Sequence, residues 1–280
     1  MKKIVVWLIA ALLLQFGIWG YLDRVIFAPS AAFTQPPDPT LAISYSYDKA
    51  YYSEISGHDL QIYSSLGHRL TRDISLKDNE SVSYFSWLPD RNLALAGVSF
   101  DFTKTTTVSL LSIDPETNSQ PVSPEVSGLA LGARIESVAF STKTNVTNIL
   151  VKDRYGTAVY RTDANNYLRR LTLGDSHINR IASLRYQDTI LYDDTVAGSV
   201  YAYVYGGRVA KVPLGTRQHY ALIGTDQSDN VYLGELNNQK LVTAIFEGKI
   251  NGDFTQIKSL DPAYPVNSIK VTYDGTISFS

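Results

Sequence analysis

The sequence predicts an all-β fold, a β-propeller of five to six four-stranded blades, preceded by one N-terminal transmembrane helix. Three observations lead to this prediction. A strand–turn–strand unit recurs along most of the chain, no long window after Leu41 carries a helical stripe of apolar residues, and residues 4–22 contain no charge. The 280 residues accordingly divide into an anchor at 1–27, a stalk at 28–40 and a propeller domain at 41–280.

The composition excludes several classes of protein. The formal net charge is −2, so no electrostatic footprint indicates a nucleic-acid partner. Cysteine is absent, which rules out disulfides, thiolate zinc sites and a catalytic cysteine. The hydrophobic fraction of 44% is enough for a packed core, and the 19 tyrosines favour strands and half-buried surfaces.

The N-terminus predicts a membrane anchor. After Lys2 and Lys3, a charge-free run of about nineteen residues, at about 1.5 Å each, just crosses a hydrocarbon core of about 30 Å. Trp19 and Tyr21 fit an interfacial aromatic belt, and the two lysines favour a cytoplasmic N-terminus. The chain is thus expected to be a single-pass protein of the cell membrane with an extracytoplasmic domain. The alternative is a signal peptide cleaved near 30–32, although the apolar run exceeds the usual ~7–15 residues.

The segment at 28–40 predicts an extended stalk. Pro36, Pro37 and Pro39 occupy three of four successive positions, which favours a polyproline-like spacer between membrane and domain. The alternative is an ordered segment packed on the rim of the domain.

A unit of strand, tight polar turn and strand accounts for the periodicity that follows. Its copies are separated by ~40–53 residues, close to the spacing of propeller blades. They lie at 43–55, 82–98, 138–152, 182–194, 221–236 and 269–280.

A second hairpin follows each of the first five units. The clearest one, at 198–214, contains Gly206-Gly207, which supplies the positive φ that a two-residue turn requires. Two hairpins make one four-stranded blade, so the pattern predicts five full blades and a lone C-terminal hairpin. Pairing of that hairpin with N-terminal strands could close the ring, giving five or six blades. The competing architecture is a β-sandwich with extra hairpins.

These turns resemble those of a known group of propellers. Asp48-Lys49, Asp90-Arg91 and Asp274-Gly275 are similar to the turns between the first two strands of bacterial extracytoplasmic β-propellers of the WD-repeat-like and TolB-like kind. The resemblance covers about residues 41–280 and implies architecture alone. The Trp-Asp dipeptide and its Gly-His partner are missing, so membership of the true WD-repeat subfamily is not expected.

Motifs of catalysis are missing from the sequence. There is no G-x-S-x-G elbow, phosphate-binding P-loop or H-E-x-x-H motif, and His58, His68, His177 and His219 are scattered. This favours a protein that is not an enzyme, with no cofactor expected other than Ca²⁺.

One set of residues predicts a ligand face. If the blades are as assigned, the links between second and third strands open on the same end of the ring, and each full blade carries a carboxylate there. Such carboxylates could hold Ca²⁺ or a cationic ligand at the channel mouth; the alternative is that they are solvated turn residues. The carboxylates are Glu54, Asp101, Asp153, Asp193, Asp194 and Glu235, and the accompanying ligand-face residues are His58, Phe102, Arg154 and Tyr155.

Two functional classes follow. The first is a membrane-anchored extracytoplasmic binding or scaffolding module of a cell-envelope assembly, whose partner is another envelope protein or a surface ligand. The second is a propeller hydrolase or lyase that uses a metal and carboxylates at the channel mouth. The missing nucleophile motif and the scattered histidines favour the first, but the fold cannot decide between them.

Overall fold

The computed structural model describes residues 42–56, 59–117, 124–174, 177–213 and 219–279. Within these ranges the chain forms five four-stranded sheets and one two-stranded sheet, all antiparallel. The strands of each sheet follow chain order, so each sheet is a meander. The prediction of five full blades followed by a lone hairpin is therefore confirmed for the described residues.

The blades follow one another along the chain. The first and second blades comprise β1 (Ala42–Tyr45), β2 (Tyr51–Ser56), β3 (Asp59–Ser64) and β4 (Arg69–Ser75), then β5 (Glu80–Trp87), β6 (Ala94–Asp101), β7 (Thr105–Ile113) and β8 (Glu125–Ala130). The third and fourth comprise β9 (Arg134–Ser141), β10 (Val146–Asp153), β11 (Gly156–Thr162) and β12 (Arg169–Arg170), then β13 (Ile178–Ser183), β14 (Thr189–Asp194), β15 (Ser199–Val204) and β16 (Val209–Lys211). The fifth and sixth comprise β17 (His219–Thr225), β18 (Val231–Leu236), β19 (Leu241–Gly248) and β20 (Phe254–Pro265), then the short 3-10 helix η2 (Val266–Ser268), β21 (Ile269–Val271) and β22 (Ile277–Phe279).

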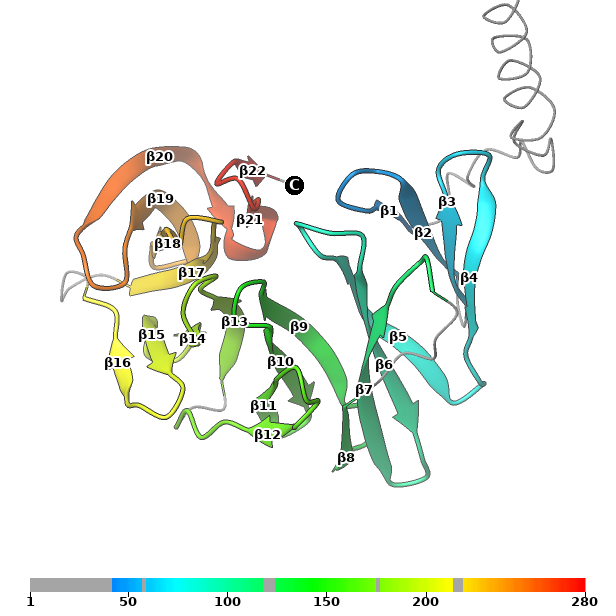
Figure 1. Cartoon of the computed structure of the whole chain (residues 1–280). Helices are drawn as coiled ribbons and strands as arrows, with labels where there is room; N and C mark the ends of the chain where they lie inside the picture. Colours follow the sequence, from blue (N-terminus) through cyan, green and yellow to red (C-terminus); the bar gives the residue numbers. More distant parts are fainter. Residues whose placement is uncertain (1–41, 57–58, 118–123, 175–176, 214–218, 280) are drawn as a thin grey trace, which may run out of the picture.

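The sheets are arranged radially around an axis (Figure 1). The first strand of a sheet lies beside the first strand of the next: β5 contacts β9, β9 contacts β13, β13 contacts β17 and β17 contacts β21. The first strands therefore line the axis, as in a β-propeller. The alternative of a β-sandwich is wrong, because its strands would pack as two facing sheets.

The core consists of apolar clusters between successive blades. Five clusters occur in the described part of the chain, one at each junction from the first blade to the sixth. Strand β10 shows why both faces of a blade are apolar: Ile149 and Val151 pack toward the second blade, and Leu150 between them packs toward the fourth. Successive side chains of a strand point to opposite faces, so a blade covered on both sides has nearly continuous apolar strands.

Aspartate side chains form the turns that the sequence repeats. The Asp48 carboxylate accepts a hydrogen bond from the backbone N–H of Ala50 at 2.8 Å, and Lys49 between them has a φ of 61°. In the sixth blade the Asp274 carboxylate accepts one from Thr276 at 3.2 Å, and Gly275 has a φ of 87°. Such Asx turns fix each hairpin locally, which explains why their residues are recognisable in the sequence.

The two ends of the ring differ in their connections. Turns between first and second strands (A–B turns) lie at one end, and turns between second and third strands (B–C turns) lie at the other, together with the linkers between blades. We refer to these as the A–B end and the B–C end.

Pairing of the C-terminal hairpin with N-terminal strands is not seen among the described residues. β21 and β22 pair only with each other there, and β1 pairs with β2, so the C-terminal hairpin does not share a sheet with the N-terminal strands. The hairpin instead packs on the fifth blade, where the ring centroids of Tyr264 and Phe279 lie 4.9 Å apart.

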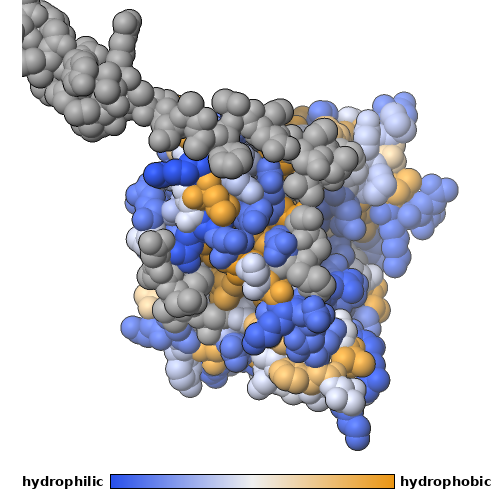
Figure 2. Space-filling view, turned by 90° about the vertical axis from the view of Figure 1, so that its right-hand side faces the viewer, coloured by the Kyte–Doolittle hydropathy of each residue, from blue (hydrophilic) through white to orange (hydrophobic). Residues whose placement is uncertain are grey.

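Seen from the side of β3 and β4, the surface is mostly hydrophilic, with apolar residues in separate patches (Figure 2).

The predicted anchor at 1–27 and stalk at 28–40 lie outside the described residues. No helix in the described ranges has the length and apolar character needed to span a bilayer.

Candidate functional site

The carboxylates predicted to form a ring are mostly engaged in local structure. Asp101 accepts a hydrogen bond from the Thr106 hydroxyl at 2.5 Å, and Asp153 accepts one from the backbone N–H of Tyr155 at 2.8 Å. No group of three or more histidine, aspartate or glutamate side chains that could hold a metal ion occurs within the ranges that the structure describes. Asp101 and Asp153 therefore use their carboxylates to stabilise the turns that follow β6 and β10.

The two remaining glutamates lie within strands. Glu54 on β2 is half-buried, and with burial its charge raises the pKa of Tyr52 to about 12. Glu235 on β18 lies opposite Tyr220, and its charge adds to the burial that raises the pKa of the Tyr220 phenol. The charge of each glutamate therefore acts on a neighbouring tyrosine of the same blade.

The predicted ligand-face residues are partly placed by the structure. Phe102 and Tyr155 are 56% and 74% exposed, as expected for a ligand face. Arg154 donates a hydrogen bond to the Tyr155 hydroxyl at 2.7 Å and lies over its ring. These two residues therefore contact each other on one B–C turn. His58 lies outside the described residues.

Asp193 and Asp194 line a common pocket of about 530 Å³ at the B–C end, which we call the interblade pocket. Its walls come from the B–C turns of the fourth and fifth blades, the start of β17 and the linker to the sixth blade. The residues that supply polar groups are Asn179, Asp193, Asp194, Thr195, His219, Asn237, Asn238, Lys240 and Asn267, and the remaining walls are Val196, Gly198, Tyr220, Ala221, Leu236, Leu241, Pro265 and Val266.

Two equivalent turns form the rim of this pocket. The Asp194 carboxylate accepts hydrogen bonds from the backbone N–H groups of Val196 and Ala197 at 2.8 and 2.9 Å. In the next blade the Asn237 side-chain oxygen accepts them from Gln239 and Leu241 at 2.9 and 3.0 Å. In both turns one Asx side chain accepts two backbone N–H groups, which fixes each side of the pocket locally.

Asp193 belongs to the framework beneath the pocket. It is only 2% exposed, and its carboxylate accepts hydrogen bonds from the backbone N–H groups of Asn179 and Arg180 at 3.0 and 2.8 Å. Burial raises the pKa of this carboxyl, whereas the two hydrogen bonds and the Arg180 charge oppose the rise. Asp193 is therefore held in place by backbone groups of its own blade and by the backbone of Leu222 in the fifth blade.

Arg180 extends this framework across three blades. Its guanidinium donates hydrogen bonds to the carbonyl oxygens of Val266 at 2.6 Å and of Ile223 and Ile269 at 3.2 Å each. Burial lowers the pKa of Arg180, and the charge of Asp193 opposes this. One side chain thus joins the fourth, fifth and sixth blades, and one of its acceptors, Val266, also lines the interblade pocket.

His219 lines this pocket, and the sequence analysis assigned no role to it. It begins β17 at the pocket rim, and a Cβ added to Gly198 would lie 2.2 Å from its Nδ1. Gly198 also has a φ of 58°, so glycine both forms the turn and makes room for the imidazole. The available signal was the glycine that closes the turn after Asp194.

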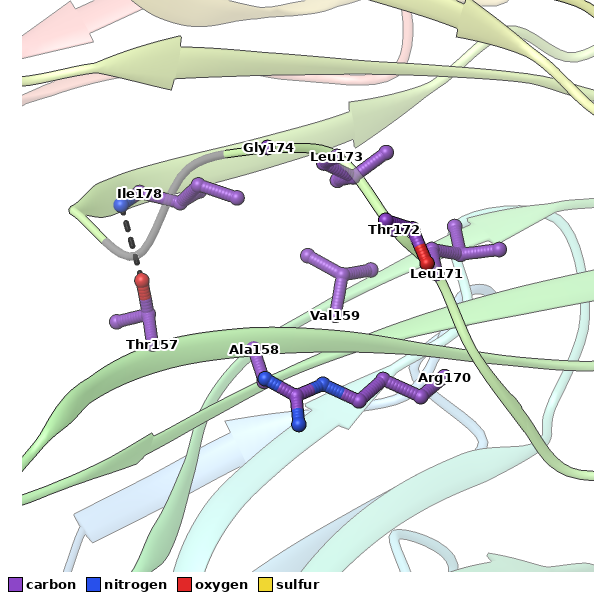
Figure 3. Close-up of a pocket in the computed structure, with 9 residues that line it drawn as sticks. All are labelled: Thr157, Ala158, Val159, Arg170, Leu171, Thr172, Leu173, Gly174 and Ile178. Atoms are coloured by element: carbon purple, nitrogen blue, oxygen red, sulfur yellow. Dashed lines mark hydrogen bonds between the residues drawn. The ribbon is translucent and has the colours of Figure 1, made fainter.

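Further cavities occur in the described structure, and two of them lie between or within the blades near the ring axis and the fourth blade. One, of about 430 Å³, lies between β11 and the linker to the fourth blade, where Thr157 accepts a hydrogen bond from the backbone of Ile178 at 2.9 Å (Figure 3). Its lining is mixed: Val159, Leu171 and Leu173 are apolar, and Thr157, Arg170 and Thr172 are polar. The other, of about 290 Å³, lies on the axis toward the A–B end.

Comparisons with known proteins agree with the observed architecture. No protein-family model matches the chain, and no curated protein matches it. Among solved structures, the chain is similar to dipeptidyl peptidase 4 from Porphyromonas gingivalis, with a TM-score of 0.54 and 11% identity over 78% of this chain and 38% of that one. It is also similar to the WD40 domain of SCAP from fission yeast, with a TM-score of 0.54 and 14% identity over 82% of this chain and 57% of that one.

A weaker likeness is to TolB from Acinetobacter baumannii, with a TM-score of 0.46 and 15% identity over 78% of this chain and 52% of that one. The chain thus spans less than two thirds of each of these three chains. WD40 domains are β-propellers. The likeness at a TM-score of 0.54, together with the radial sheets, shows that the chain is a β-propeller.

Proposed function

We propose that the chain is a membrane-anchored, extracytoplasmic binding or scaffolding module of the cell envelope, and that the interblade pocket receives its ligand. The observation that carries this proposal is the pocket itself: two matching turns present polar side chains around a cavity of about 530 Å³ above a rigid framework. Small-molecule sites have volumes of about 300–1,000 Å³ and combine apolar walls with a few convergent polar groups.

The charges of the pocket suit binding. Asp194, His219 and Lys240 lie on its rim, while Tyr220, Leu236 and other apolar residues form its walls. Such a pocket can receive a small polar compound or a side chain that an envelope partner inserts.

Binding is favoured over catalysis by the state of the buried acid. A general acid must be able to exchange its proton with the substrate. The Asp193 carboxylate instead accepts hydrogen bonds from two backbone N–H groups and lies near the charge of Arg180. The residue with the most perturbed environment in the pocket therefore supports structure.

We propose to test this by placing a large side chain in the interblade pocket at a position that does not contact Asp193 or Arg180 through a hydrogen bond. Asn238 is exposed and lines the pocket, whereas Gln239, its exposed neighbour on the same turn, does not. Ligand-observed NMR of the full chain in detergent, with a library of amino acids, sugars, short peptides and small acids, should find compounds whose binding Asn238→Trp abolishes. The matched Gln239→Trp variant should retain them.

The outcomes separate the two functional classes. Hits that bind equally to both variants, or a library without hits, would contradict a ligand site in this pocket. Chemical conversion of a hit by the wild-type chain would favour the propeller hydrolase or lyase instead.

The membrane location is supported by the sequence. A charge-free run of about nineteen residues follows Lys2 and Lys3, and an uncleaved anchor of this kind would hold the propeller outside the cytoplasm.

A further inference from the structure

The axial cavity lies at the A–B end, away from the interblade pocket. Inner strands and A–B turns of the second to sixth blades enclose its volume of about 290 Å³. Trp87 and Phe140 contribute aromatic walls, Ile181 and Val271 contribute aliphatic ones, and Arg185 contributes a positive charge. No part of the proposed function uses this cavity.

Arg185 is a guanidinium without a polar partner. Among the described residues its side chain makes no ion pair and donates no hydrogen bond, and its Nε is fully buried. It contacts only aromatic faces, with its central carbon 5.5 Å from the ring centroid of Tyr186 and 5.1 Å from that of Tyr273. Because a guanidinium has five N–H donors and a fixed charge, this environment leaves its strongest interactions unused.

The neighbouring carboxylates are committed elsewhere. Asp229 accepts hydrogen bonds from the backbone N–H groups of Arg185 and Tyr186 at 2.5 and 3.2 Å. Asp226, which lines the cavity, accepts them from Ser228, from both the backbone and side chain of Asn230, and from the Tyr232 hydroxyl, at 2.8–3.1 Å. Asp226 therefore stabilises the A–B turn of the fifth blade, and Asp229 joins that turn to the A–B turn of the fourth blade. Neither carboxylate forms an ion pair with Arg185 among the described residues.

Two hydroxyl groups beside Arg185 are also unpaired. The Tyr273 hydroxyl and Thr142 Oγ1 are buried without a hydrogen-bond partner in the described part of the chain, and both residues line the cavity. Buried polar groups are nearly always satisfied in native proteins, so three such groups around one cavity indicate a bound acceptor. A water molecule could satisfy a hydroxyl, but it would not balance the arginine charge.

We propose that the axial cavity binds a carboxylate attached to a small apolar or aromatic group, with Arg185 as the charge partner and the Tyr273 and Thr142 hydroxyls as further donors. A carboxylate is planar and matches the fork of guanidinium donors. The aromatic and aliphatic walls contact the apolar part of the ligand. The carboxylate belongs either to a free small acid or to the C-terminus of a peptide with an apolar last residue.

The test uses the tryptophan in the cavity. The chain has three tryptophans, and replacing Trp7 and Trp19 with phenylalanine leaves Trp87 as the only one in the full chain. Its fluorescence is titrated with benzoate, with the neutral analogue benzamide, and with N-acetylated peptides ending in phenylalanine as the free acid or the amide. Benzoate should give a saturable change, and benzamide should bind about tenfold more weakly or worse.

The variants assign the donors. Arg185→Gln should weaken benzoate binding about ten- to a hundredfold, and Tyr273→Phe about three- to tenfold. The matched control is Arg154→Gln, because Arg154 likewise lies over the ring of the next tyrosine, 4.7 Å from its centroid, but on the B–C turn of another blade. That control should bind benzoate like the parent.

Several results would overturn the proposal. Equal binding of benzoate and benzamide, no saturable change, or unchanged binding by a folded Arg185→Gln variant would each contradict a carboxylate site built on Arg185. If Arg185→Gln fails to fold, the proposal is still tested by comparing benzoate with benzamide on the parent chain and by the binding of benzoate to Tyr273→Phe. Tighter binding of the peptide acid than of benzoate would assign the site to a chain terminus, and the reverse would assign it to a free acid.

Discussion

The tie that Arg180 makes between three blades predicts a large and localised loss of stability. Arg180→Met would remove one guanidinium that donates to the carbonyls of Val266, Ile223 and Ile269, and would leave Asp193 buried without the opposing charge. Hydrogen bonds from charged donors contribute about 1.5–3 kcal/mol each, and recovery of the desolvation cost of the arginine offsets part of the sum. Removing one partner from a buried charged network typically costs about 3–5 kcal/mol, which we take as the expected decrease in the free energy of unfolding.

This prediction is measured on the full chain by thermal unfolding and hydrogen exchange. The expected decrease corresponds to a Tm about 6–20 °C lower for a domain of this size. Backbone amides of β21 and β22 should exchange faster, while those of the second blade keep their rates, because Arg180 contacts only the fourth, fifth and sixth blades. The control is Arg169→Met, since Arg169 is exposed and makes one long hydrogen bond of 3.4 Å to the Tyr205 hydroxyl. An unchanged Tm, or faster exchange spread evenly over all blades, would refute the role assigned to Arg180.

Further predictions concern single residues. Asp193→Ala should lower the free energy of unfolding by about 2–5 kcal/mol, because two buried N–H groups lose their acceptor. Asp194→Ala, on the exposed turn, should lower it by about 1 kcal/mol. Similar decreases for the two variants in denaturant unfolding would contradict the structural role of Asp193. The pKa of Tyr52 is raised to about 12, so the unfolded chain ionises this phenol first, and the stability it contributes is present below about pH 10 and lost as the pH rises toward 12. Ultraviolet titration of Tyr52→Phe should lack one late-ionising phenol, and an unchanged titration would be inconsistent with the burial. Gly198→Ala should lower the Tm and shift the NMR signals of His219, because it combines a φ of 58° with a clash; a variant with unaltered His219 signals would speak against this packing.

The fold was largely predictable because its signals are local. Asx turns such as those at Asp48 and Asp274 are encoded within three residues, and strands such as β10 are apolar on both faces because both are covered. The blade number along the chain follows from counting these hairpins. Ring closure is not local, and only the structure shows that β21 and β22 pack against the fifth blade and do not pair with the described N-terminal strands.

The site was less predictable because it depends on which end of the ring each side chain faces and on what that side chain already binds. Asp153 and Asp193 lie at the ends of β10 and β14, next to the B–C turns, and only the structure shows that their carboxylates accept hydrogen bonds from backbone N–H groups. Arg185 and Tyr273 are separated in the chain by all the strands from β14 to β21, so no sequence pattern links them. Their proximity arises from the closing of successive blades around the axis.

The absence of cysteine allows one direct test of the central claim, that the propeller is a binding module held outside the cytoplasm by its anchor. Single cysteines introduced as Asn238→Cys at the interblade pocket and Lys3→Cys before the apolar run are labelled with a membrane-impermeant maleimide on intact spheroplasts. The account predicts that Asn238→Cys is labelled on intact spheroplasts, that a ligand of the pocket slows this labelling, and that Lys3→Cys reacts only after permeabilisation. Labelling of Asn238→Cys only after permeabilisation would contradict it.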